Sequence, residues 1–82
     1  MEYDQNKVDE MILALLHLTS STDQFGTRAW KAFDWQSMDR LFKKGYISDP
    51  HEKGATLTFS KEGAELSRQM FEKYCSKETG QD

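Results

Sequence analysis

Apolar residues recur in the first part of the chain, NKVDEMILALLHLTS, at the spacing of one face of a helix. The residues on this face are Val8, Met11, Ile12, Leu15 and Leu16, and Leu13 and Leu18 widen it. A face of this width predicts a helix that is buried on more than one side. Asp4 or Asn6 can cap its start, and Asp9 and Glu10 suit the positive end of its dipole.

The middle of the chain, TRAWKAFDWQSMDRLFKKGYI, predicts two helical pieces that break near Asp34, preceded by a polar connection, TSSTDQFG. The first piece covers about residues 27–32 and is short. The second starts with Asp34 as its N-cap and ends at Gly45, which suits the left-handed position after a helix. Its apolar stripe consists of Trp35, Met38, Leu41 and Phe42, and Gln36, Ser37, Arg40 and Lys43 are left facing solvent.

After this helix the pattern changes to the alternation of strands. Tyr46 and Ile47 can begin one strand, the loop SDPHEKG follows, and ATLTF places Leu57 and Phe59 on one face of a second strand. The loop segment 49–54 is polar and is expected to contain no apolar anchor. We therefore predict that it is the most mobile interior segment.

The last predicted element is a helix over about residues 61–74, which Ser60 caps. The sequence thus predicts a single domain over residues 1–76 and a disordered polar tail over residues 77–82. The phase of the apolar positions in three separate elements predicts one shared core. Its expected members are Trp35, Leu41, Phe59 and Phe71.

The order of these elements predicts a mostly helical α+β domain, a winged helix-turn-helix with a two- or three-stranded antiparallel wing sheet. LFKKGYI, the charged loop and LTFSKEGAEL resemble the MarR-type and PadR-type bacterial regulators. In those families a basic-Gly-apolar signature ends the recognition helix, and the wing returns in a strand that ends in LT. The resemblance covers Trp35 to Leu66, and it implies DNA binding as the commonest use of the fold.

A second likeness extends over nearly the whole chain. The blocks RAWK-x-x-DW-x-x-x-DRL, then KGYISDP, LT and EG, resemble a small bacterial family of unknown function that begins with an acidic, apolar helix. This likeness implies a winged-helix-like domain and no known activity.

The net charge of −3 argues against general adhesion to nucleic acid, but positive charge gathers in the middle of the chain. Residues 28–47 hold five cations against two carboxylates, a net charge of +3. A solvated helix face explains such a cluster as well as a binding site does. If the chain binds double-stranded DNA, the predicted contact residues are Arg28, Lys31, Gln36, Ser37, Arg40, Lys43, Lys44 and Lys53.

The alternative function is a protein-interaction module that keeps the winged fold without binding DNA. The expected recognition helix is short, and the carboxylate of Asp34 at its start would repel phosphates. MarR-type proteins dimerise through long terminal helices, and this chain has one candidate, at its C-terminus. We therefore expect a monomer or a weak homodimer through that helix, with double-stranded DNA or a protein as the partner.

The two tryptophans also allow two interpretations. Either both Trp30 and Trp35 fill the core where the short helices meet, or one of them is partly exposed beside Lys31 and Arg40. An exposed tryptophan there would serve as an anchor for a stacked base or a partner protein.

The sequence predicts no catalytic residue, no metal site and no cofactor, and the chain is not expected to be an enzyme. Cys75, His17 and His51 lie far apart without CxxC or HxxxH spacing, and no Gly-rich phosphate loop is present. A single cysteine suits a reducing cytoplasm. The start, MEYDQNK, is unlike a signal peptide, and no apolar run reaches the ~20 residues of a membrane span, so we expect no membrane association.

Overall fold

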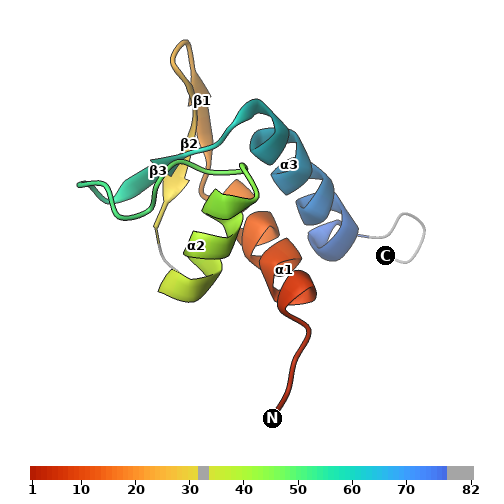
Figure 1. The fold of residues 1–82 in the computed structure, drawn as a ribbon. Helices are drawn as coiled ribbons and strands as arrows, with labels where there is room; N and C mark the ends of the chain where they lie inside the picture. Colours follow the sequence, from red (N-terminus) through yellow and green to blue (C-terminus); the bar gives the residue numbers. More distant parts are fainter. Residues whose placement is uncertain (32–33, 78–82) are drawn as a thin grey trace.

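The computed structural model describes residues 1–31 and 34–77 of the 82. Within these residues three helices and one three-stranded antiparallel sheet form a small α+β domain (Figure 1). The predicted tail lies outside the described residues, apart from Lys77. In chain order the elements are α1 (Gln5–Leu18), β1 (Ser21–Asp23), β2 (Gly26–Trp30), α2 (Trp35–Lys43), β3 (Thr56–Thr58) and α3 (Lys61–Cys75).

All three helices begin at the side-chain caps that the sequence predicts. Asp4, Asp34 and Ser60 each accept a hydrogen bond from a backbone amide of the first turn, at 2.9, 3.0 and 3.0 Å. The end of α2 is confirmed as well, because Gly45 has a φ of 81° that few other residues adopt.

The strands correct the prediction for the segment between α1 and α2. The helix expected at residues 27–32 is wrong for its described part, because Gly26–Trp30 is the central strand of the sheet. Part of the expected polar connection forms the edge strand β1, and a tight turn at residues 24–25 joins the two. Pairing with β3 explains the difference: Ala29 lies opposite Leu57, and both are buried on one face. This gain in burial outweighs the weak helical preference of a few residues.

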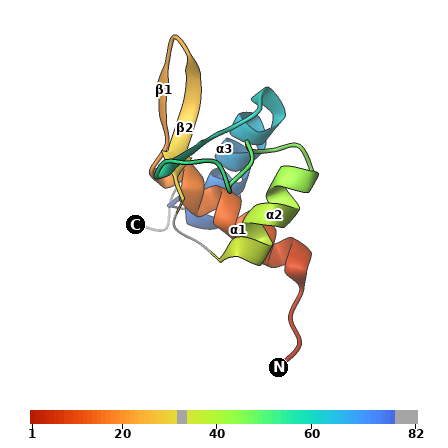
Figure 2. The same cartoon turned by 60° about the vertical axis from the view of Figure 1, so that its left-hand side comes forward.

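The sheet has one buried and one exposed face. Ala29 and Leu57 are 2% exposed, whereas their chain neighbours Arg28, Trp30 and Thr58 are exposed. The strand predicted at Tyr46 and Ile47 is reduced to a single bridge between Ile47 and Phe59. In Figures 1 and 2 the β1–β2 hairpin extends past the helices, and its tip stands clear of the body.

The core forms around α1, which packs against α2, α3 and β2. Leu41 and Phe59 are buried as predicted, but Trp35 is 55% exposed and Phe71 is half-buried against the ring of His17. The predicted four-residue core is therefore wrong for Trp35, and Phe71 lies outside the buried cluster. The buried residues that form the core are Ile12, Leu13, Leu16, Ala29, Met38, Leu41, Ile47, Leu57 and Phe59.

The first helix is buried on two sides, yet part of its predicted apolar face is in solvent. Met11, Leu15 and Leu18 are all exposed, and they form a stripe at i, i+4 and i+7. Leu13 and Leu16 point into the core instead, since α2 and α3 occupy that side of α1.

The last helix is held on the segment before it by close backbone contact. A Cβ atom added to Gly63 would lie 1.9 Å from the carbonyl oxygen of Tyr46, so only glycine fits at this position. The Ser60 amide donates to the same carbonyl at 2.9 Å, and the Ser60 hydroxyl donates to that of Gly45 at 2.6 Å. Among the described residues, no helix is both long and apolar enough to cross a membrane.

Candidate functional site: an aromatic surface on α2

One face of α2 presents large apolar side chains to solvent. Trp35 and Phe42 lie seven residues apart on the helix, so they share a face, and Asp39 lies between them. Trp35 is 55% exposed and Phe42 is 43% exposed. With His51 from the loop after α2, these residues form what we call the aromatic surface: Trp35, Asp39, Phe42 and His51.

His51 fixes the position of the Trp35 ring. The two rings are stacked, with centroids 4.9 Å apart and planes inclined by 16°. The Nε2 atom of His51 lies 2.8 Å from Oδ1 of Asp39, one helical turn beyond Trp35. An exposed tryptophan that is already held in one orientation loses little conformational freedom when a partner covers it.

The loop that carries His51 is anchored at several points. Pro50 is fully buried, which corrects the expectation that segment 49–54 has no apolar anchor. The His51 amide donates to Asp49 Oδ1 at 2.9 Å, and Lys31 Nζ donates to the Glu52 carbonyl at 2.6 Å. The reason given for high mobility is therefore wrong, and mobility itself stays a prediction.

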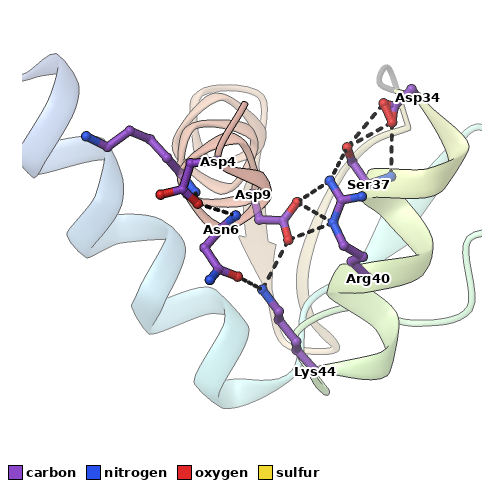
Figure 3. A network of polar contacts seen from close by, with 8 residues as sticks. Asp4, Asn6, Asp9, Asp34, Ser37, Arg40 and Lys44 are labelled. Atoms are coloured by element: carbon purple, nitrogen blue, oxygen red, sulfur yellow. Dashed lines mark hydrogen bonds and ion pairs between the residues drawn. The ribbon is translucent and has the colours of Figure 1, made fainter. Parts of the chain in front are cut away.

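The opposite side of α2 is joined to α1 by a network of charged groups (Figure 3). Asp9 of α1 is only 2% exposed. Its carboxylate accepts three hydrogen bonds from Arg40, the shortest 2.8 Å, and one from Lys44 Nζ at 3.1 Å. Arg40 also donates to the Ser37 hydroxyl at 3.0 Å, and that hydroxyl donates to Asp34 at 2.8 Å.

The electrostatics of Asp9 follow from these contacts. Burial by itself would raise the pKa of Asp9, but the hydrogen bonds and charges of Arg40 and Lys44 more than offset it. The pKa of Asp9 is therefore lowered, and the carboxylate stays ionised in the folded chain. The same contact raises the pKa of Arg40. This network is an internal ion pair between two helices.

The network changes the interpretation of the predicted DNA-contact residues. Ser37 and Arg40 were expected to face solvent, but Ser37 is 1% exposed and the guanidinium of Arg40 points at Asp9. Lys44 points at the same carboxylate. Arg28 lies on the outer face of the hairpin, 3.0 Å from Asp23.

The other predicted contact residues are scattered. Lys31 donates to a loop carbonyl, whereas Gln36, Lys43 and Lys53 are exposed, and their side chains have no hydrogen bond or ion pair within the part of the chain that the structure describes. The structure therefore does not bring the eight residues together on one basic face. It joins three of them in one network, in which Arg40 and Lys44 bind the buried carboxylate of Asp9 and Ser37 accepts from Arg40 (Figure 3).

Both tryptophans are on the surface, so the interpretation that places them in the core is wrong. Trp30 is 55% exposed on the outer face of the sheet, at the end of β2. It directly precedes Lys31, whose amide donates to the Ala55 carbonyl at 2.9 Å. The loop that carries His51 and Ala55 thus lies close to the backbone beside Trp30 and to the ring of Trp35.

Sequence reasoning missed the roles of Asp9 and His51. The position of Asp9 along the helix could have indicated its burial. Asp9 lies three and four residues before Ile12 and Leu13, and therefore on the buried face of α1. A carboxylate at such a position requires a cationic partner. No comparable signal exists for His51, whose contacts depend on how the loop folds back onto α2.

Two comparisons identify relatives of the chain. A family model described as a domain of unknown function (DUF6429) matches residues 4–77, so the chain belongs to this family. The chain is also 42% identical over 71 residues to an uncharacterised protein, y4hR, of Sinorhizobium fredii (strain NBRC 101917 / NGR234). The match covers 87% of this chain and 92% of that protein. No solved structure matches the chain. The expected likeness to a small bacterial family of unknown function is confirmed, and the likeness to MarR-type and PadR-type regulators stays a prediction.

Proposed function

We propose that this member of the DUF6429 family is a non-enzymatic protein-binding module that contacts its partner through the aromatic surface. The observation that carries the proposal is Trp35, a large ring that is 55% exposed and yet held by the stacked His51. Tryptophan is among the residues that contribute most energy to protein interfaces. The neighbouring Phe42 enlarges the apolar area available to a partner.

The distribution of charge favours a protein over DNA as the partner. A phosphate contact needs a cation that is free to displace counterions. Arg40 and Lys44 share the carboxylate of Asp9, and Arg28 is paired with Asp23, so none of the three is a free cation. Within the aromatic surface, Asp39 supplies a carboxylate that would repel phosphates.

The second candidate function is DNA binding through a winged fold, and two observations support it. The loop at residues 49–54 lies between Ile47 and β3, where a wing is expected, and Lys43 and Lys53 are exposed. Against it, the described residues before α2 form a strand, whereas a helix-turn-helix needs two successive helices. We rank this function below protein binding.

The test compares baits that differ at single residues. Four baits are immobilised: wild type, Trp35→Ala, Phe42→Ala and Trp30→Ala. A lysate of the source bacterium is passed over each bait, and the proteins that each bait retains are identified. The strongest candidate is then purified and titrated by calorimetry. We expect Trp35→Ala to weaken binding by about 30-fold or more, as for a central interface residue, and Phe42→Ala to weaken it less. Trp30→Ala reports whether the surface extends onto the sheet.

Leu18→Ala is the matched control, since Leu18 is 65% exposed on α1 and lies outside the aromatic surface. Equal binding by wild type and Trp35→Ala would overturn the proposal. A parallel anisotropy titration with mixed DNA duplexes at low salt tests the second function. Binding that weakens steeply with salt, and that Lys43→Ala or Lys53→Ala reduces, would favour DNA instead.

A further inference from the structure

The strand β1 is an open edge of the sheet. The strand order is β1-β2-β3, so β1 pairs on one side only, and all three of its residues are exposed. The hairpin that carries it projects from the body in both views (Figures 1 and 2). No described segment covers this edge.

The hydrogen bonds of β2 show which backbone groups of β1 are free. Thr22 lies opposite Thr27 in the register of the two strands. The Thr27 carbonyl accepts from the Phe59 amide at 2.9 Å, so the backbone polar groups of Thr27 point toward β3 and away from β1. In an antiparallel pair, opposite residues either both face each other or both face away. The amide and carbonyl of Thr22 therefore point outward from the open edge.

This edge strand is short and carries one charged residue, Asp23, but it lacks the other features that usually prevent pairing between chains. Natural edge strands carry lysines, prolines or bulges, or are covered by another segment. Here Ser21, Thr22 and Asp23 form an unbulged strand with neither lysine nor proline. A free donor and acceptor at one residue, on a projecting hairpin, are the groups that a second strand would engage.

We propose that β1 pairs antiparallel with β1 of a second copy of this chain, about a twofold axis at Thr22. The outward amide and carbonyl of Thr22 then bond to those of Thr22 in the second copy. Ser21 lies opposite Asp23 of the second copy, and Asp23 opposite Ser21. The two three-stranded sheets join into one continuous sheet with the same face exposed in both copies.

Charge and side-chain chemistry favour a second copy as the occupant. The central pair would be threonine against threonine, which is a favourable cross-strand pair. Asp23 of the second copy would lie beside Ser21, and Ser21 is paired on its other side with Arg28. Arg28 already bonds Asp23 of its own chain at 3.0 Å, and Asp23 of the second copy would lie level with Arg28 on the same face, one strand further away. By contrast, α3, the helix expected to dimerise, uses Leu66 and Met70 to pack on the chain's own core.

A cross-linking experiment tests both the pairing and its register, in a Cys75→Ser background. Ser21 and Asp23 of opposite copies form a non-hydrogen-bonded pair, with Cα atoms about 4.5 Å apart, close enough for a disulfide. We expect a mixture of Ser21→Cys and Asp23→Cys proteins to give a disulfide-linked dimer under mild oxidation. Each variant alone would place its cysteines about 8 Å apart and should cross-link at least 10-fold less.

A second experiment tests whether the backbone amide of Thr22 takes part in the association. Proline at position 22 removes an amide that faces solvent in the monomer, so Thr22→Pro should keep the fold, as judged by circular dichroism. Light scattering should show wild type shifting toward twice 9.5 kDa with concentration. Thr22→Pro should weaken this association at least 10-fold, and Thr22→Ala, which keeps the amide, much less.

A wild-type protein that remains at 9.5 kDa at millimolar concentration would overturn the proposal. So would cross-linking of the single variants as fast as the mixture. A stable complex that forms only with a different protein and that Thr22→Pro abolishes would show that the edge takes a foreign strand instead. Trp35→Ala should leave the dimer intact, so a failure of this inference is distinguishable from a failure of the proposed function.

Discussion

The two sides of α2 differ in a way that reverses the usual distribution of residues. Toward α1, the helix places Arg40 and Lys44 around the buried carboxylate of Asp9. Toward solvent, it presents Trp35 and Phe42. Charged groups join the helix to α1 beside the buried Met38 and Leu41, while the two aromatic rings remain outside the core. The comparison indicates that the charged side serves stability and the aromatic side is available for contact with a partner.

The largest effect is expected from removing Asp9. Asp9→Ala would leave Arg40 partly buried without its partner, and breaking a buried ion pair costs about 3–5 kcal/mol of unfolding free energy. Urea melts of wild type and variant measure this difference. Asp23→Ala is the matched control, since its pair with Arg28 is exposed, and its melt should overlay that of wild type. If the two variants lost equal stability, the network would not be the stabilising side of α2.

A smaller effect is expected from acid. The pKa of Asp9 is lowered in the folded chain, so the ion pair contributes fully above the ordinary aspartate value of 3.8. That contribution is lost as the pH falls through the lowered pKa. Stability curves from pH 7 down to about pH 2 should therefore fall less steeply for Asp9→Asn than for wild type. Parallel curves would contradict ionisation of Asp9 in the native state.

The smallest effect on stability is expected on the aromatic side. Trp35→Ala removes a stacked but exposed ring and should cost about 1 kcal/mol or less. Leu41→Ala, on the buried side of the same helix, should cost roughly 2–5 kcal/mol. Denaturant melts compare the two, and acrylamide should quench the tryptophan fluorescence of the native protein efficiently. A Trp35→Ala loss as large as that of Leu41→Ala would place Trp35 in the core and remove the basis of the proposed surface.

Local features of the fold were predictable from the sequence. The caps at Asp4, Asp34 and Ser60 and the helix end at Gly45 depend on residues close together in the chain, and all four are confirmed. The alternation that buries Leu57 and Phe59 is equally local. Helical and strand periodicity alone therefore locates α1, α2, β3 and α3.

The hairpin and the candidate site were decided by contacts between distant segments. Residues 27–30 form a strand because β3, almost thirty residues later, pairs with them. The orientation of α2 depends on Asp9, which lies 31 residues before Arg40 and holds it at 2.8 Å. Periodicity identifies apolar positions on a helix, but the nine residues of α2 carry apolar side chains on more than one side. Only the position of α1 decides which side is buried, because a buried carboxylate must meet its cations, and this leaves Trp35 in solvent.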